Sequence, residues 1–141
     1  MTDRVSGGCR CGAVRFESDA PPFAVRACWC RDCQYFAAGS ATVNAIFRRD
    51  GLRITGELRE YESTADSGTL MHRGFCPACG TPLTSRSASR PEFLIIRVGA
   101  LDEPARFAPE STIWTASAPP WARFDDTPLN CEGQPPPPVA R

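Results

Sequence analysis

The segment Cys28-Trp29-Cys30-Arg31-Asp32-Cys33 places three cysteines within six residues. One cysteine pair precedes it, Cys9 and Cys11, and another follows it, Cys76 and Cys79. Seven of the 8 cysteines in this 141-residue chain therefore fall into tight groups. Sulfur ligands at such short spacing are typical of metal sites. We therefore expect the fold to be organised around these three groups.

The residues that open the chain favour metal binding over disulfides. Residues 1–7 have no apolar run typical of a signal peptide, and the longest aliphatic run, Phe93–Ile96, is too short to cross a bilayer. We therefore expect a cytoplasmic protein without a membrane partner. In the reducing cytoplasm, closely spaced cysteines bind metal more often than they oxidise.

The composition excludes several function classes. The 16 basic and 16 acidic residues balance, which argues against nucleic acid and acidic membranes as partners. All the basic residues are arginine, so Schiff-base lysines and phosphate-loop lysines are excluded. The one histidine, His72, leaves most nucleophile–base dyads without their usual base. If the chain is an enzyme, a metal must supply most of the chemistry.

Short alternating segments with little helix predict a mainly β domain over residues 1–130. Residues 131–141 read as a proline-rich, disordered tail. Residues 108–129 are expected to wrap the surface, with Trp114 and Trp121 as anchors. The predicted strands are Ala13–Ser18, Phe23–Ala27, Ser40–Phe47, Leu52–Thr55, Thr69–Phe75 and Glu92–Val98.

Two local predictions concern the connections. Arg48–Gly51 ends in Asp-Gly and predicts a turn that pairs the strand before it with the strand after it. Gln34–Ala38 is expected to form a short helix that ends at Gly39.

Cys76-Pro77-Ala78-Cys79-Gly80 is the most specific local motif. Proline favours the first corner of a turn and glycine tolerates positive φ, so both sulfurs point to one position, as in zinc knuckles. A redox dithiol would need a following helix, and Pro82 argues against one. Cys9 and Cys11 lie on one face of an extended chain and can share an ion with this pair.

Ligand counting divides the seven clustered cysteines between two zinc ions. Two tetrahedral shells need eight ligands, so one site is complete and the other lacks one. Cys28 and Cys30 share a strand face, and Arg31-Asp32 forms the turn that brings Cys33 back. The four outer cysteines complete a structural site, and the inner three leave a coordination position open, which is typical of catalytic zinc. Alternatively, Cys131 or His72 fills that position and makes the site structural.

The cysteine motifs and their spacing resemble one known family. The segments that carry the resemblance are Gly8-Cys9-x-Cys11-Gly12, Cys28-x-Cys30-x-x-Cys33 and Phe75-Cys76-x-x-Cys79-Gly80. They are similar to the glutathione-dependent formaldehyde-activating enzymes, a family that also includes centromere protein V. The resemblance covers about residues 6 to 130. Trp29 and the segment 111–114 stand where histidines are common in the family.

The resemblance implies a fold, a site and a reaction. It implies a β-tent fold of antiparallel sheets around a structural zinc. It assigns that zinc to Cys9, Cys11, Cys76 and Cys79, and a catalytic zinc to Cys28, Cys30 and Cys33. The implied activity is that of a carbon–sulfur lyase, which joins formaldehyde and glutathione into S-hydroxymethylglutathione.

The leading hypothesis is therefore a zinc-dependent carbon–sulfur lyase with a small thiol substrate, such as a glutathione adduct. Zinc with three thiolates is electron-rich yet thiophilic, so a substrate sulfur is a plausible fourth ligand. Arg26 and Arg31 are candidates to bind a substrate carboxylate. Trp29, Tyr35 and Phe36 are candidates to line an apolar pocket. The alternatives are a non-catalytic zinc scaffold and a thiol or redox sensor.

Overall fold

The computed structural model describes residues 3–136 and confirms the mainly β class. A three-stranded sheet has the order β1-β2-β5, with β1 (Val5–Gly8), β2 (Arg15–Ser18) and β5 (Leu52–Thr55). A seven-stranded sheet has the order β10-β3-β4-β9-β8-β7-β6. Its strands are β3 (Ala24–Cys28), β4 (Thr42–Arg48), β6 (Arg59–Thr64), β7 (Leu70–Phe75), β8 (Pro82–Ser87), β9 (Phe93–Arg97) and β10 (Ser111–Ile113).

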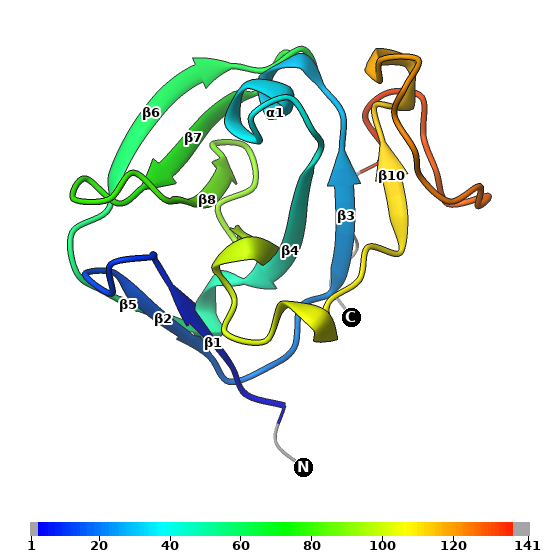
Figure 1. Ribbon diagram of the computed structural model, residues 1–141. Coiled ribbons are helices and arrows are strands. Elements are labelled where there is room, and N and C mark those ends of the chain that lie inside the picture. The colour runs from blue at the N-terminus through cyan, green and yellow to red at the C-terminus, as the bar shows by residue number, and fades with distance from the viewer. Residues whose placement is uncertain (1–2, 137–141) are drawn as a thin grey trace.

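The helical segments are short. Figure 1 shows α1 (Arg31–Phe36) beyond the carboxyl end of β3, at one end of the larger sheet. The described chain also contains the 3-10 turns η1 (Arg49–Gly51), η2 (Val98–Ala100), η3 (Pro104–Arg106) and η4 (Thr115–Ser117). No helix within residues 3–136 has the length and apolar character needed to cross a membrane.

The main hydrophobic core lies between the two sheets. Successive residues of a strand point to opposite faces, so β4 and β9 in the middle of the larger sheet contribute alternate residues to this core, and β3 and β8 beside them contribute one each. The core joins residues of the small sheet to residues of the large one, among them Val5, Phe16, Ala45, Phe47, Leu94 and Ile96. The opposite face of the large sheet is therefore free to carry polar side chains, and the pocket described below lies on that face.

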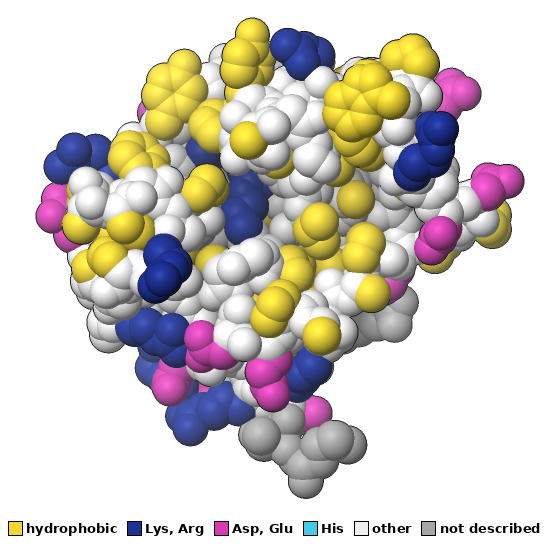
Figure 2. All heavy atoms as spheres, in the orientation of Figure 1, with side chains coloured by type: hydrophobic (Ala, Val, Ile, Leu, Met, Phe, Trp, Pro, Cys, Tyr) yellow, Lys and Arg dark blue, Asp and Glu magenta, His cyan; other side chains and the backbone are white. Residues whose placement is uncertain are grey.

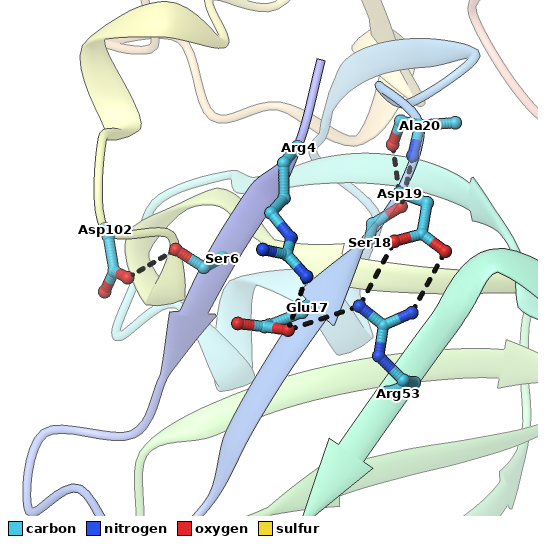
Figure 3. Close-up of polar contacts among 8 residues, drawn as sticks. All are labelled: Arg4, Ser6, Glu17, Ser18, Asp19, Ala20, Arg53 and Asp102. Atoms are coloured by element: carbon cyan, nitrogen blue, oxygen red, sulfur yellow. Dashed lines mark hydrogen bonds and ion pairs between the residues drawn. The ribbon is translucent and has the colours of Figure 1, made fainter. Parts of the chain in front are cut away.

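Ion pairs cross the exposed face of the small sheet (Figure 3). The guanidinium of Arg53 on β5 lies 3.0 Å from the Asp19 carboxylate and 3.2 Å from that of Glu17 on β2. Arg4 approaches Glu17 at 3.4 Å, so the same carboxylate receives two cations. Figure 2 shows acidic and basic side chains interspersed over this part of the molecule. Exposed pairs of this kind contribute little individually, so the small sheet depends on its apolar face for stability.

The predicted hairpin around Asp50-Gly51 is wrong. Both strands exist, but β4 pairs with β3 and β9, whereas β5 pairs with β2 in the other sheet. Arg49–Gly51 forms the 3-10 turn η1 rather than a two-residue hairpin turn, so the chain leaves the large sheet here. The buried side chains of β4, including Ala45 and Phe47, favour the centre of the large sheet.

The C-terminal segment holds a strand that the sequence did not indicate. Ser111–Ile113 forms β10, which runs parallel to β3 and adds a parallel pair to the expected antiparallel sheets. The backbone N–H of Cys131 donates to the Thr112 carbonyl at 3.0 Å, and the N–H of Trp114 donates to the Gly133 carbonyl. The predicted disorder therefore does not hold for residues 131–133, while residues 137–141 lie outside the described residues.

Trp114 and Trp121, the two predicted anchors, both make contacts within the C-terminal part of the domain. Trp121 is 64% exposed, yet its ring packs edge-on against the buried ring of Trp29, with centroids 5.9 Å apart. The indole N–H of Trp114 donates to the Gln134 side chain at 3.0 Å. Trp121 thus connects the irregular C-terminal segment to the domain, and Trp114 connects two parts of that segment to each other.

A Gly56→Ala substitution should lower the free energy of unfolding by about 2 kcal/mol or more. Gly56 has φ +93°, and an added Cβ would lie 2.0 Å from the carbonyl oxygen of Ala13, in the loop that carries Cys11. Gly51→Ala is a matched control, because no atom lies within 4 Å of the position of its added Cβ. Urea unfolding of the two variants measures the difference, and equal midpoints would contradict this reading of Gly56.

Candidate metal centres

Two loops that are far apart in the sequence bring four cysteines together. Cys9 and Cys11 lie between β1 and β2, and Cys76 and Cys79 lie between β7 and β8. Their four sulfurs lie within 4.8 Å of one another. The Cys9–Cys11 separation is 3.6 Å and the Cys11–Cys76 separation is 3.8 Å. Four sulfurs around a zinc ion at ordinary bond lengths are separated by about 3.8 Å, so this donor set fits tetrahedral zinc.

The backbone of these loops explains how the sulfurs converge. The expected extended chain over Cys9 and Cys11 is wrong, because Cys9 to Gly12 is a turn closed by the Gly12 N–H and the Cys9 carbonyl at 3.1 Å. The second loop is closed by the Gly80 N–H, which donates to the Cys76 carbonyl four residues earlier at 2.8 Å. Gly12 and Gly80 both have positive φ, as Gly80 was predicted to have. Hydrogen bonding to Thr81 lowers the pKa of Cys79 to about 5, which favours the thiolate form that metals bind.

The three central cysteines form a second, more deeply buried group. Cys28 ends β3, Cys30 precedes α1 as its N-cap, and Cys33 lies within the helix. The helix thus begins three residues before the predicted start at Gln34. Cys33 is brought toward Cys28 and Cys30 by the first turn of this helix, and not by a turn of Arg31-Asp32 alone. The three sulfurs lie within 4.8 Å of one another. Each residue is at most 8% exposed.

The close approach of these sulfurs makes their protonation interdependent. Contacts with Cys28 and Cys30 lower the pKa of the Cys33 thiol to about 2. The contact with Cys30 raises the pKa of Cys28 well above its ordinary value. One thiol therefore loses its proton readily, while a second negative charge beside it is costly. A divalent cation removes that cost, so the group fits a metal ion with thiolate ligands.

The three-cysteine group forms part of the wall of a pocket of ≈ 440 Å³. Alternation along the strands creates the pocket floor, because residues two apart share a face. In neighbouring strands, register places Ile46 beside Ile95, Ile95 beside Ser85, and Ser85 beside Arg73. The same faces of these strands and of β3 contribute further residues to the pocket lining, namely Arg26, Asn44, Arg97, Phe93, Ser87 and Met71. The four-cysteine group does not border this pocket.

The pocket is basic. Its described lining includes five arginines, Arg26, Arg73, Arg86, Arg90 and Arg97, and one carboxylate, Asp66. Three of the arginines have carboxylate partners: Arg73 with Asp32 at 3.5 Å, Arg86 with Glu60 at 2.7 Å, and Arg90 with Glu92 at 3.3 Å. Within residues 3–136, no ion pair involves Arg26 or Arg97. These two cations are therefore the ones left for anionic groups in the pocket.

Of the residues predicted to bind the substrate or to line a pocket, only Arg26 lies in the pocket lining. Arg26 lines the pocket, whereas Arg31 stacks on the exposed ring of Tyr35 at 5.0 Å, outside the pocket lining. Phe36 packs under the guanidinium of Arg73, and Trp29 packs against Trp121. The expected aromatic pocket lining by Trp29, Tyr35 and Phe36 is therefore wrong.

His72 and Cys131 belong to neither cysteine group. His72 Nδ1 lies 3.6 Å from the Glu62 carboxylate, between strands β7 and β6. Cys131 packs against the three-cysteine group together with Ile113 and Trp114, but its sulfur lies outside the 4.8 Å set. Cys131 is thus a neighbour of the three-cysteine centre, and His72 pairs with an acid elsewhere.

Sequence reasoning missed Arg97, Asn44 and Thr42. All three are buried polar residues on the face of the large sheet that carries the pocket. The available signal was a charged residue inside the otherwise apolar segment Phe93–Val98. An unexplained arginine in a buried strand indicates a functional or structural anion nearby.

The chain is thus a mainly β domain with two cysteine groups that could each hold a metal ion, and the three-cysteine group borders a pocket. Comparison with known proteins identifies the family. The sequence matches the glutathione-dependent formaldehyde-activating enzyme family over residues 4–117, so the chain belongs to that family.

Two individual proteins support this assignment. A Halomonas elongata protein that provisionally carries the same enzyme name is 28% identical over 127 residues, 86% of this chain and 81% of the relative. The crystal structure of a Rhodobacter sphaeroides protein superposes with a TM-score of 0.55 at 26% identity. That match covers 69% of this chain and 87% of the other.

Proposed function

We propose that the chain is a zinc-dependent carbon–sulfur lyase acting on a small thiol–aldehyde adduct, with S-hydroxymethylglutathione as the first substrate to test. The observation that carries the proposal is the position of the three-cysteine group. Its sulfurs border the basic pocket, whereas the four-cysteine group does not. The family name supplies the thiol and the aldehyde.

The two groups are proposed to hold one zinc ion each. Cys9, Cys11, Cys76 and Cys79 supply a full tetrahedral shell, which suits a structural role. Cys28, Cys30 and Cys33 supply three ligands and leave one position for a substrate sulfur. Zinc bound there would hold that sulfur as a thiolate and polarise the adjacent aldehyde.

The proposed reaction balances without a further reactant. In the direction of adduct formation, the substrate sulfur bonds to the formaldehyde carbon, and the C=O π electrons move to oxygen. The thiol releases one proton and that oxygen takes up one, so the reaction involves no net gain or loss of protons. The lyase direction reverses these steps. Asp66 is the carboxylate among the described lining residues and is the candidate to exchange a proton at the adduct hydroxyl.

Arg26 is proposed to bind a carboxylate of the substrate. It lies on β3, two residues before Cys28 and on the same strand face, and borders the same pocket. Since no carboxylate of the described chain pairs with it, its guanidinium is available for a bidentate contact. The preferred substrates are therefore small thiols that carry a carboxylate, as glutathione does.

An Arg26→Gln variant should raise KM for the glutathione adduct by roughly 10-fold to 100-fold with kcat nearly unchanged, as expected for one lost charged hydrogen bond. Kinetics with 2-mercaptoethanol, which lacks a carboxylate, should not change. Arg31→Gln serves as the control, because Arg31 lies outside the pocket lining. Equal KM increases for both thiols, or for both variants, would contradict this role.

The activity itself is tested by NMR exchange spectroscopy of formaldehyde mixed with glutathione. Zinc-loaded protein at catalytic concentration should speed interconversion of free glutathione and its hydroxymethyl adduct. Exchange as slow as in the protein-free mixture would support the non-catalytic scaffold instead. Release of zinc on mild oxidation, with a disulfide among Cys28, Cys30 and Cys33, would favour the sensor hypothesis.

We also propose a cytoplasmic location and a zinc-binding domain that comprises residues 1–130. None of the cysteines of the described chain is part of a disulfide. Closely spaced cysteines that bind metal rather than oxidise are typical of a reducing compartment.

A further inference from the structure

Arg97 is a buried cation without an acidic partner. It is 8% exposed, and no ion pair within residues 3–136 involves it. Its Nε is buried and has no hydrogen-bond partner in the described chain. Burial of an unpaired charge is costly, so a compensating negative charge is expected nearby. The three-cysteine group lines the same pocket as Arg97 and is the candidate to supply it.

A chain of hydrogen bonds leads from Arg97 toward that group. Arg97 Nη1 donates to Oδ1 of Asn44, its cross-strand neighbour on β4. Asn44 Nδ2 donates to Oγ1 of Thr42 at 2.9 Å, two residues earlier on the same face. Both Asn44 and Thr42 are buried, at 8% and 5% exposed, so water does not compete for these groups.

The direction of the chain is fixed by the chemistry of its first member. A guanidinium can only donate, so the Asn44 side chain must present its oxygen to Arg97 and its amide N–H to Thr42. The Thr42 oxygen then accepts, and its own proton is left for another acceptor. Thr42 pairs with Cys28 across β3 and β4, and its hydroxyl interacts with the Cys33 thiol.

We propose that Arg97, Asn44 and Thr42 form a positioning relay that delivers one hydrogen bond to the Cys33 sulfur and offsets the charge of the three-thiolate centre. This inference rests on the proposed zinc at that centre. Zn²⁺ with three thiolates carries a formal charge of −1, which one guanidinium balances.

The four-cysteine group shows why only one centre needs such a relay. Cys11 and Cys79 are exposed, so water screens the charge of a metal–thiolate unit there. Cys28, Cys30 and Cys33 are all buried, so their charge must be balanced by protein groups. Outer hydrogen bonds of this kind orient ligands and typically change metal affinity by about 10-fold to 100-fold when lost.

Thr42 offers a matched pair of variants. Thr42→Val keeps the shape and removes the hydroxyl, whereas Thr42→Ser keeps the hydroxyl. Competition with a graded chelator measures retention of the two zinc ions of the full chain. We expect Thr42→Val to weaken retention of one zinc by roughly 10-fold to 100-fold, Thr42→Ser to behave as wild type, and the other zinc to be unaffected.

Asn44→Asp tests the direction of the relay. An aspartate still accepts from Arg97 but cannot donate to Thr42, so the hydroxyl would turn to the new carboxylate and leave Cys33. Zinc retention should fall at least as far as in Thr42→Val. Asn130→Asp is the control, because it makes the same chemical change at a side chain that bonds to the backbone of Thr112 and Asp125 and takes no part in the relay.

Cobalt substitution gives a spectroscopic signature that general destabilisation would not produce. A hydrogen bond lowers the energy of thiolate lone pairs, so its loss should shift the thiolate-to-cobalt band to longer wavelength in Thr42→Val and not in Thr42→Ser. Equal retention and equal spectra for these two variants would overturn the relay alone. A wild type that binds one zinc per chain would overturn both the relay and the proposed function.

Discussion

A Cys76→Ser variant is expected to be largely unfolded at neutral pH. Cys76 is 0% exposed, and its sulfur joins the β7–β8 turn to the β1–β2 loop, 65 residues away in sequence. Structural zinc supplies about 10–16 kcal/mol in small zinc domains, which is comparable to the whole stability of a domain, about 5–15 kcal/mol. Loss of one ligand from the proposed four-cysteine zinc site would therefore remove a large part of the folding free energy.

Circular dichroism and amide chemical-shift dispersion measure this loss of structure. Cys131→Ser is the matched control, because Cys131 belongs to neither ligand group, and its spectra should match those of the wild type. A folded Cys76→Ser protein with an unchanged melting temperature would show that the four-cysteine centre is not structural.

A Cys30→Ser variant is expected to remain folded, to lose one zinc ion and to lose activity by more than about 10³-fold, the equivalent of roughly 4 kcal/mol of transition-state stabilisation. Cys30 is the N-cap of α1, and its sulfur accepts a hydrogen bond from the Cys33 N–H at 3.3 Å. Serine is a favoured N-cap and keeps that acceptor, so the helix should persist while the ligand is lost.

Zinc content, the far-ultraviolet spectrum and the rate of adduct interconversion should be measured on the same Cys30→Ser preparation. Loss of activity with both zinc ions retained would mean that Cys30 acts without binding metal. Full activity after loss of one zinc would place the chemistry elsewhere. Either result would contradict the proposed role of the three-cysteine centre.

The division of the cysteines could be predicted because it follows from local spacing and from the number of ligands in a tetrahedral shell. Cys76 to Gly80 forms a closed turn with positive φ at Gly80, as its residue types require. The two groups that converge in the structure are those that ligand counting separated. Their metal ions and roles stay predictions.

The pocket could not be predicted, because it depends on register between distant strands. Arg97 borders it through the pairing of β9 with β4, and Arg73 through that of β7 with β8. The strand β10 was missed because its pairing with β3 joins segments some 85 residues apart. The false hairpin at Asp50-Gly51 arose in the opposite way, since a local turn signal was outweighed by burial of β4.

The most direct test of the central claim is native mass spectrometry of the purified protein, combined with mapping of the cysteines that react with an alkylating reagent. We predict two zinc ions per chain, with Cys131 reactive and the seven clustered cysteines protected. One zinc ion per chain, with Cys28, Cys30 and Cys33 alkylated, would contradict the account.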